Sequence, residues 1–259
     1  MSLETSLTDR VGLIELNRPD RMNALTVDLV CALGTEAAAL VDQGARALVL
    51  AGRGPAFCAG ADLSLVDRAL AEEPAPVLTP LVEELHRSLK RLRGLPVPLV
   101  AAVEGPAVGA GMGLALCADL RVLGEGARLV PGYLGIGSSP DGGVSYFLTR
   151  MVGSARALSL LLRNQPLGAA EAASLGLAEP PVPDGSALRS ALELARSLAS
   201  APPLALLRVR ELVDRATTLG LAEQLDLEQE RVTELWKTHD FGEGVRAFLQ
   251  RRTPEFRGD

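Results

Sequence analysis

Residues 98–113 read PLVAAVEGPAVGAGMG, an apolar run that passes into a glycine-rich turn and then into a second apolar run. The short continuous run Val97–Val103, bounded by proline and glycine, predicts a buried strand. We expect a loop over Gly105–Gly111 and a buried helix over Met112–Ala118. A helix that begins on such a turn offers unpaired N–H groups and a partial positive charge at its first residues.

The same arrangement occurs once more, earlier in the chain. Ala45–Ala51 (ARALVLA) predicts a short strand, and Gly52–Ala61 (GRGPAFCAGA) predicts a glycine-rich loop. Small residues let a ligand approach the backbone closely, and two converging N–H groups can hold a developing oxyanion. Each turn alone is equally compatible with a role in packing. The presence of both turns favours an oxyanion-binding site, because the chain offers little other catalytic machinery. It has only two histidines and lacks the nucleophile-elbow, Walker A and HExxH motifs.

The remaining pattern indicates a strand–helix core followed by a helical end. Repeated strand–helix units are typical of α/β layering. We expect a hairpin over Leu3–Asn17, a strand over Leu120–Leu123 and an irregular segment over Arg128–Asp141. Helices are expected over Val27–Val41, Leu63–Glu73, Thr79–Arg93, Val144–Met151, Ser154–Leu162, Ala169–Gly176, Ser186–Ala199, Pro202–Ala216, Leu219–Lys237 and Gly242–Gln250.

Composition excludes several classes of protein. The 259 residues are 47% hydrophobic and carry a net charge of −6, which predicts a globular chain with no general attraction to nucleic acid. The long apolar stretch Leu95–Ala118 contains Glu104 and three prolines, so we expect no membrane span. Three isolated cysteines and a polar N-terminus favour a cytoplasmic protein, and no metal site is expected.

The ordered set of motifs resembles the crotonase, or enoyl-CoA hydratase/isomerase, superfamily. The resemblance implies an α/β fold, a crotonase-like spiral of repeated ββα units with a helical C-terminal trimerisation region. Residues 1–195 would form the spiral core with the acyl-CoA site, and residues 196–259 the oligomerisation region of a homotrimer or hexamer. The substrate would be an acyl-CoA thioester, with coenzyme A entering only as part of it and no other cofactor. The motifs that carry the resemblance are Asn17-Arg-Pro, Asn23-Ala-Leu25, Phe57–Leu63 (FCAGADL), Pro98–Gly105 with the GAG turn, Cys117-Ala-Asp119, Gly137–Gly143, Glu243–Leu249 (EGVRAFL) and Pro254-Glu-Phe256.

Carried over position by position, the resemblance assigns the site. The backbone N–H groups of Ala61 and Ala110 would hold the thioester oxygen, and the loss of one such donor costs about 3–4 kcal/mol of transition-state stabilisation. Asp62 has a second interpretation as the cap of the following helix. The substrate-binding positions implied are Ala24, Leu25, Ala59, Asp62, Leu63, Gly109, Phe248 and Arg251.

The departures from the family pattern bear on the reaction. Family hydratases use two glutamates, whose positions here hold Gly113 and Gly132, with Tyr133 beside the second. Asp141 stands where similar isomerases place a single acid/base carboxylate. One such group is enough to move a proton between C2 and C4 of an enoyl-CoA. We therefore predict an enoyl-CoA isomerase of fatty-acid or aromatic-acid catabolism, with Asp141 and Tyr133 among its catalytic residues.

Three alternatives stay open. An enoyl-CoA hydratase would use Asp141 to hold a water. In a haloaryl-CoA dehalogenase-like enzyme, Asp141 would attack the ring and His86 would activate the water that cleaves the ester, although the family's aromatic residue there is a tryptophan and Tyr133 stands in its place. A non-catalytic acyl-CoA binder would have lost its carboxylates, with Pro-Asp-Gly serving only as a turn.

Overall fold

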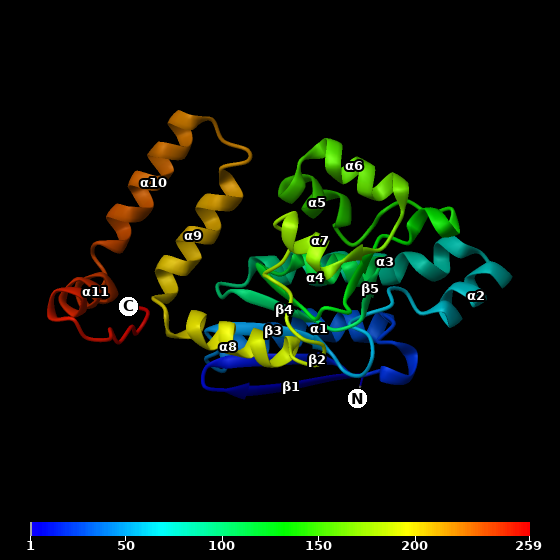
Figure 1. The fold of residues 1–259 in the computed structure, drawn as a ribbon, viewed down its shortest axis with the longest axis horizontal. Coiled ribbons are helices and arrows are strands. Elements are labelled where there is room, and N and C mark those ends of the chain that lie inside the picture. Colours follow the sequence, from blue (N-terminus) through cyan, green and yellow to red (C-terminus); the bar gives the residue numbers. More distant parts are fainter. Residues whose placement is uncertain (1) are drawn as a thin grey trace.

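The computed structural model describes residues 2–259 and is built on a five-stranded sheet (Figure 1). The strand order is β1-β2-β3-β4-β6. β1 pairs with β2 antiparallel, as the predicted hairpin requires, and the other neighbours are parallel. The strands are β1 (Leu3–Thr8), β2 (Val11–Leu16), β3 (Ala47–Gly52), β4 (Leu99–Val103) and β6 (Leu120–Leu123).

Helices cover both faces of the middle of this sheet, which explains why the central strands β3 and β4 are continuously apolar. Leu48 and Leu50 of β3 point to the face covered by α1 (Val27–Asp42), α3 (Pro74–Gly94) and α4 (Ala110–Cys117). The residue between them, Val49, points to the other face, which α8 (Ala187–Ser200) covers. α8 meets the sheet with an alanine every fourth residue, and these small side chains let the helix lie close to the strands. They are Ala187, Ala191, Ala195 and Ala199.

A second, three-stranded sheet in the order β5-β7-β8 corrects two sequence-based predictions. β5 (Pro106–Val108) lies within the segment predicted as a loop, and β7 (Arg128–Val130) lies within the segment predicted as irregular. These strands are only three residues long, and β8 (Leu167–Gly168) only two. Strands this short have no alternation to detect, so only their pairing in the folded chain defines them.

The remaining α-helices of the core agree with the predicted positions within a few residues, whereas the short 3-10 helices η1 and η2 were not predicted. The exception is α3, which begins at Pro74 instead of Thr79 and contains Pro80. Pro74 stands in the first helical turn, where its missing N–H would have no partner, whereas Pro80 lies inside the helix. The other helical elements of the core are η1 (Pro19–Arg21), α2 (Leu63–Ala71), η2 (Tyr133–Ile136), α5 (Val144–Val152), α6 (Ser154–Arg163) and α7 (Ala169–Ser174).

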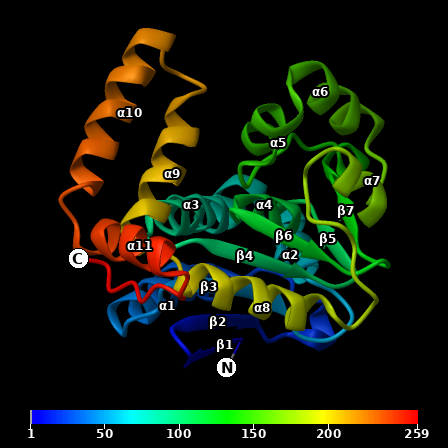
Figure 2. The same cartoon turned by 60° about the vertical axis from the view of Figure 1, so that its left-hand side comes forward.

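The last three helices form an arm that extends away from the sheet (Figures 1 and 2). They are α9 (Pro203–Arg215), α10 (Leu221–Leu235) and α11 (His239–Gln250). The predicted division between residues 195 and 196 falls inside α8, whose Ala199 still packs on the sheet. The arm therefore starts after residue 200, and its role in assembly stays a prediction. None of the helices within residues 2–259 has the length and hydropathy that a membrane-spanning helix requires.

Candidate active site

The first glycine-rich turn is held in an extended conformation by Leu25. The Leu25 N–H donates to the Gly60 carbonyl at 2.7 Å, and the Asp62 N–H donates to the Leu25 carbonyl at 3.1 Å. This is a parallel bridge between Leu25 and Ala61. Because peptide groups alternate in direction along an extended chain, the N–H of Ala61 itself faces away from Leu25.

On that other side lies the second turn, with the start of α4. A Cβ atom placed on Gly60 would lie 2.8 Å from the Val108 carbonyl oxygen and 3.7 Å from the Ala110 nitrogen. Gly109, with φ +53°, precedes α4 without a side chain that could cap it. Among residues 2–259, neither the Ala61 N–H nor the Ala110 N–H has a hydrogen-bond partner in the protein. The two predicted oxyanion donors are therefore close in space and free to bind a ligand.

The turn that carries Asp141 lies against the same end of α4. A Cβ atom on Gly142 would be 3.4 Å from the Ala110 Cα atom. One carboxylate oxygen of Asp141, Oδ1, is buried and has no hydrogen-bond partner within the described chain. Buried polar atoms are almost always paired in folded proteins, so an unpaired carboxylate oxygen beside two free N–H groups is the strongest sign of a reactive site here.

Tyr133 also borders this site, next to the second glycine-rich turn and the Asp141 turn. Its ring is buried against Gly109, and its O–H donates to the Asp141 carbonyl oxygen at 3.2 Å. Burial and the neighbouring Asp141 carboxylate raise the pKa of the Tyr133 phenol well above its usual value. Tyr133 therefore stays protonated and remains a hydrogen-bond donor.

Gly113 and Gly132, which the resemblance places where hydratases have glutamates, lie in surroundings that disfavour a side chain. A Cβ atom on Gly113 would lie 2.3 Å from the Gly142 carbonyl oxygen, so no larger side chain fits there unless the Asp141 turn moves. Gly132 has φ +77°, a conformation that strains any residue with a side chain.

The structure places the other predicted residues of the core around the two turns. Ala24 and Leu25 are buried beside Gly60, and Ala59 donates its N–H to the Met22 carbonyl at 2.9 Å. The Asp62 carboxylate accepts the Ser64 N–H at 3.0 Å, so its predicted capping role, at the start of α2, is confirmed. Leu63 is exposed. Their contacts with a substrate stay predictions.

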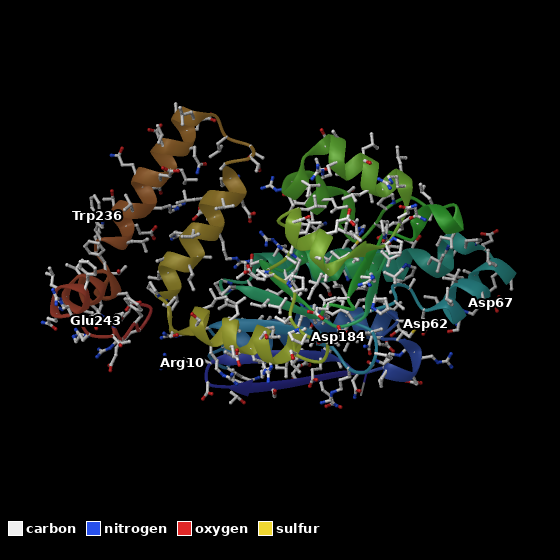
Figure 3. All side chains as sticks on the ribbon, viewed as in Figure 1. Arg10, Asp62, Asp67, Asp184, Trp236 and Glu243 are labelled. Atoms are coloured by element: carbon white, nitrogen blue, oxygen red, sulfur yellow. The ribbon has the colours of Figure 1, made fainter. Side chains whose placement is uncertain are left out.

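Phe248 and Arg251 are not brought to the turns within one chain. They lie on and just after α11, across the molecule from α2 and β5 in both ribbon views (Figures 1 and 2). Figure 3 shows the same separation, with Asp62 at one end and Glu243 at the other. Any contribution of Phe248 and Arg251 to such a site would have to come from a second copy.

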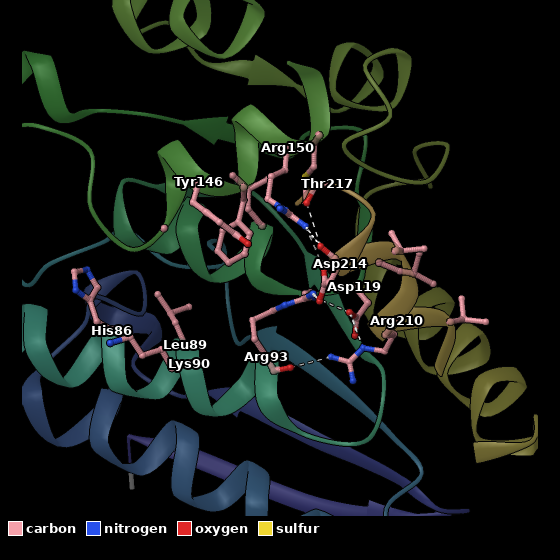
Figure 4. A pocket seen from close by; sticks show the side chains of 18 residues that line it. His86, Leu89, Lys90, Arg93, Asp119, Tyr146, Arg150, Arg210, Asp214 and Thr217 are labelled. Atoms are coloured by element: carbon pink, nitrogen blue, oxygen red, sulfur yellow. Dashed lines mark hydrogen bonds and ion pairs between the residues drawn. The ribbon is translucent and has the colours of Figure 1, made fainter. Parts of the chain in front are cut away.

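His86 lines a groove of about 910 Å³ between α3, α5 and α9 (Figure 4). Gly143 lines the same groove, yet within residues 2–259 no hydrogen bond or ion pair joins His86 to Asp141. At the other end of the groove, Arg210 binds Asp119 at 3.0 Å and Arg93 binds Asp214 at 2.7 Å. These ion pairs tie α9 to the core.

Sequence reasoning did not single out Arg18 as a residue of the site. Its side chain is only 22% exposed and forms a 2.8 Å ion pair with Asp62. The signal was present, because Arg18 belongs to the Asn17-Arg-Pro motif, but nothing in the motif names its partner.

Comparison with known proteins identifies the family of this chain. Residues 7–259 match the family model "Enoyl-CoA hydratase/isomerase". The chain is 37% identical over 257 residues to a probable enoyl-CoA hydratase of Rhodobacter capsulatus, covering 99% of this chain and 98% of the relative. It is also 37% identical over 249 residues to the 1,2-epoxyphenylacetyl-CoA isomerase of Escherichia coli, covering 95% of this chain and 94% of the relative.

Solved structures show the same fold. The crystal structure of an enoyl-CoA hydratase from Polaromonas sp. JS666 superposes with a TM-score of 0.93 at 34% identity, covering 98% of this chain and 99% of the other. The protein therefore belongs to the enoyl-CoA hydratase/isomerase family and has the crotonase fold.

Proposed function

We propose that the protein is an enoyl-CoA isomerase in which Asp141 is the single acid/base. The observation that carries this proposal is the buried Asp141 Oδ1, which like the N–H groups of Ala61 and Ala110 has no hydrogen-bond partner among residues 2–259. The carboxylate takes a proton from C2 of a 3-enoyl-CoA. The electrons of that C–H bond form a dienolate, whose negative charge rests on the thioester oxygen between the Ala61 and Ala110 N–H groups. Protonated Asp141 then returns the proton at C4, which leaves the double bond between C2 and C3.

Tyr133 supports this role without taking part in the proton transfer. Its hydrogen bond to the Asp141 backbone fixes the turn, and its ring supports Gly109 before the second oxyanion donor. The substrate passes along Ala24, Leu25 and Ala59, and CoA enters as part of the substrate with no other cofactor. We further propose a cytoplasmic homotrimer or hexamer.

Enoyl-CoA hydration is the second candidate, and the name of the Rhodobacter relative favours it. Asp141 would then hold a water for addition to a 2-enoyl-CoA. The missing glutamates at Gly113 and Gly132 count against it.

The test follows double-bond migration and water addition separately on 3-enoyl-CoA and 2-enoyl-CoA panels of several chain lengths. We expect migration in the wild type and a loss of about a hundredfold or more in kcat for Asp141→Asn, since general acid–base catalysis contributes that much. Asp67→Asn, an exposed carboxylate on α2 (Figure 3), is the matched control and should keep full activity.

Other outcomes discriminate the alternatives. Water addition without migration would establish the hydratase. Tight binding of acyl-CoA with neither reaction would move the assignment to a binder or to a haloaryl-CoA substrate.

A further inference from the structure

Arg18 spans the segment that carries the first oxyanion donor. One guanidinium nitrogen, Nη1, donates to the Ala24 carbonyl oxygen at 2.5 Å, and the other, Nη2, donates to Asp62 Oδ2 at 2.8 Å. Ala24 and Asp62 are the immediate neighbours of Leu25 and Ala61, the two bridged residues. The guanidinium therefore clamps both strands of the bridge from one side.

Both carboxylate oxygens of Asp62 already accept hydrogen bonds, one from Arg18 and the other from Ser64 in the first turn of α2. Its Oδ2 accepts from Arg18, while its Oδ1 accepts the Ser64 N–H at 3.0 Å and the Ser64 hydroxyl at 2.6 Å. The Asp62 side chain is 8% exposed. A buried carboxylate with all its partners inside the protein has little capacity left for a substrate, which argues against direct substrate contact.

The contacts of Arg18 also help to fix the direction in which the Ala61 N–H points. Two backbone hydrogen bonds to Leu25 fix the peptides before and after Ala61, and the ion pair prevents residues 24 and 62 from separating. If the bridge opened, the Ala61 N–H could turn away from the Ala110 N–H. A planar guanidinium, whose separate nitrogens donate to two different groups at once, suits this task better than an ammonium, which is a single point charge.

The charge of the pair matters as much as its geometry. Asp62 follows Ala61 directly in the chain, and Ala61 carries the N–H that binds the developing negative charge in the proposed function. Paired with Arg18, the carboxylate is neutralised and does not oppose the oxyanion. Without Arg18 it would be a buried, uncompensated negative charge beside the hole.

From these contacts we infer that Arg18 and Asp62 are positioning residues, which hold the Ala61 N–H in the oxyanion hole and neutralise the charge beside it. This inference rests on the proposed function, in which that N–H binds the thioester oxygen. It replaces the sequence-based assignment of Asp62 to substrate binding with a role exerted through Ala61.

The experiment is a double-mutant cycle with Asp62→Asn, Arg18→Met and the double variant. Asp62→Asn keeps an oxygen that can cap α2 but loses the ion pair, and it should lower kcat about tenfold. Arg18→Met leaves an unpaired carboxylate and should lower kcat about a hundredfold. The double variant should be more active than Arg18→Met alone, because the uncompensated charge is gone. KM should change by less than about threefold in each.

A second readout does not depend on turnover. A saturated acyl-CoA, labelled with ¹³C at the thioester carbonyl, should show a lowered carbonyl stretching frequency when bound to the wild type. In Asp62→Asn and Arg18→Met the frequency should return toward the free value. Arg53→Met, which breaks pairs with Glu4 and Glu15 on the same sheet, is the matched control and should behave as wild type. Arg18→Lys provides an intermediate variant if Arg18→Met does not fold.

The outcomes separate this inference from the proposed function. If the wild type turns over no enoyl-CoA but the carbonyl shift is lost in the variants, the inference stands and the proposed reaction fails. If KM rises while kcat and the carbonyl frequency are unchanged, Asp62 contacts substrate directly and the inference is overturned. It is also overturned if all variants match Arg53→Met.

Discussion

At the scale of single residues, buried polar side chains decide where the loops of the site lie. Asn23 is completely buried, and its amide nitrogen donates to the carbonyl oxygens of Arg53 and Ala56 at 2.9 and 2.8 Å. Its amide oxygen accepts the Arg18 N–H at 2.8 Å. One side chain therefore joins the loop before Leu25 to the loop before Phe57. Removing it would leave several buried backbone groups unpaired.

A pH prediction belongs to Asp62. Hydrogen bonds from Ser64 and the Arg18 guanidinium lower the pKa of Asp62 from 3.8 to about 2. A lowered folded-state pKa contributes stability that is present above about pH 4 and is lost as the pH falls through 2. The shift corresponds to roughly 2 kcal/mol. Urea denaturation at several pH values should therefore show the free energies of unfolding of wild type and Asp62→Asn converging by about that amount between pH 5 and 2. A constant difference would contradict an ionised, stabilised Asp62.

At the scale of elements, α4 is packed so closely that a side chain added at Gly111 or Gly113 would force the neighbouring backbone to move. A Cβ atom on Gly111 would lie 2.3 Å from the Cys58 carbonyl oxygen, and one on Gly113 would lie equally close, at 2.3 Å, to that of Gly142. Both contacts are with backbone, which cannot rotate away as a side chain can. The helix therefore touches the first oxyanion turn on one side and the Asp141 turn on the other, and it sets the distance between them.

Adding one methyl group tests this packing. Gly113→Ala should lower the free energy of unfolding by about 1–3 kcal/mol and also reduce turnover, because the Asp141 turn must move. Gly94→Ala, at the end of α3 with open space around it, should change the free energy of unfolding by less than about 0.5 kcal/mol. Thermal and urea unfolding of both variants, with kcat, would check this. Equal stability of the two would show that the turn is pliable.

At the scale of the whole molecule, the arm is incompletely packed within one chain. Neither α9 nor α10 has a buried residue, and the contacts of α9 with the core include the Arg210–Asp119 and Arg93–Asp214 pairs. Many large apolar side chains of the arm are exposed, including Phe248 at 83% and Trp236 at 56%. Figure 3 shows Trp236 on the arm. An apolar surface of this extent is typical of an interface. In the proposed trimer or hexamer, a second copy of the chain would bury this apolar surface.

The native mass and the single tryptophan test this assembly. Light scattering should give three or six times 27.1 kDa for the wild type. Leu221→Asp with Leu225→Asp, two exposed positions one turn apart on α10, should shift the mass toward the monomer and move the Trp236 emission to the red as that ring is exposed. Gln229→Asp on the same helix is the control and should keep the native mass. A monomeric wild type would refute the assembly.

Much of the secondary structure followed from the sequence because its signals are local. Continuous apolar runs placed β3, β4 and β6, and helical spacing with proline and glycine boundaries placed α1 and the arm helices. The two glycine-rich turns and Asp141 were also evident as candidates. The two- and three-residue strands β5, β7 and β8 were not, because their only stabilisation comes from pairing with distant segments.

The sequence by itself determined the family and the residue types available for chemistry, and it predicted that the two hydratase glutamates are replaced by Gly113 and Gly132. Tertiary structure alone decided which atoms are free. The N–H groups of Ala61 and Ala110 and the Oδ1 atom of Asp141 lie near one another in the fold, and residues 2–259 give them no hydrogen-bond partner. The pairing of Arg18 with Asp62, 44 residues apart, was likewise set only by the fold. Hydrogen bonds between distant segments depend on packing in three dimensions, and no periodicity in a sequence encodes them.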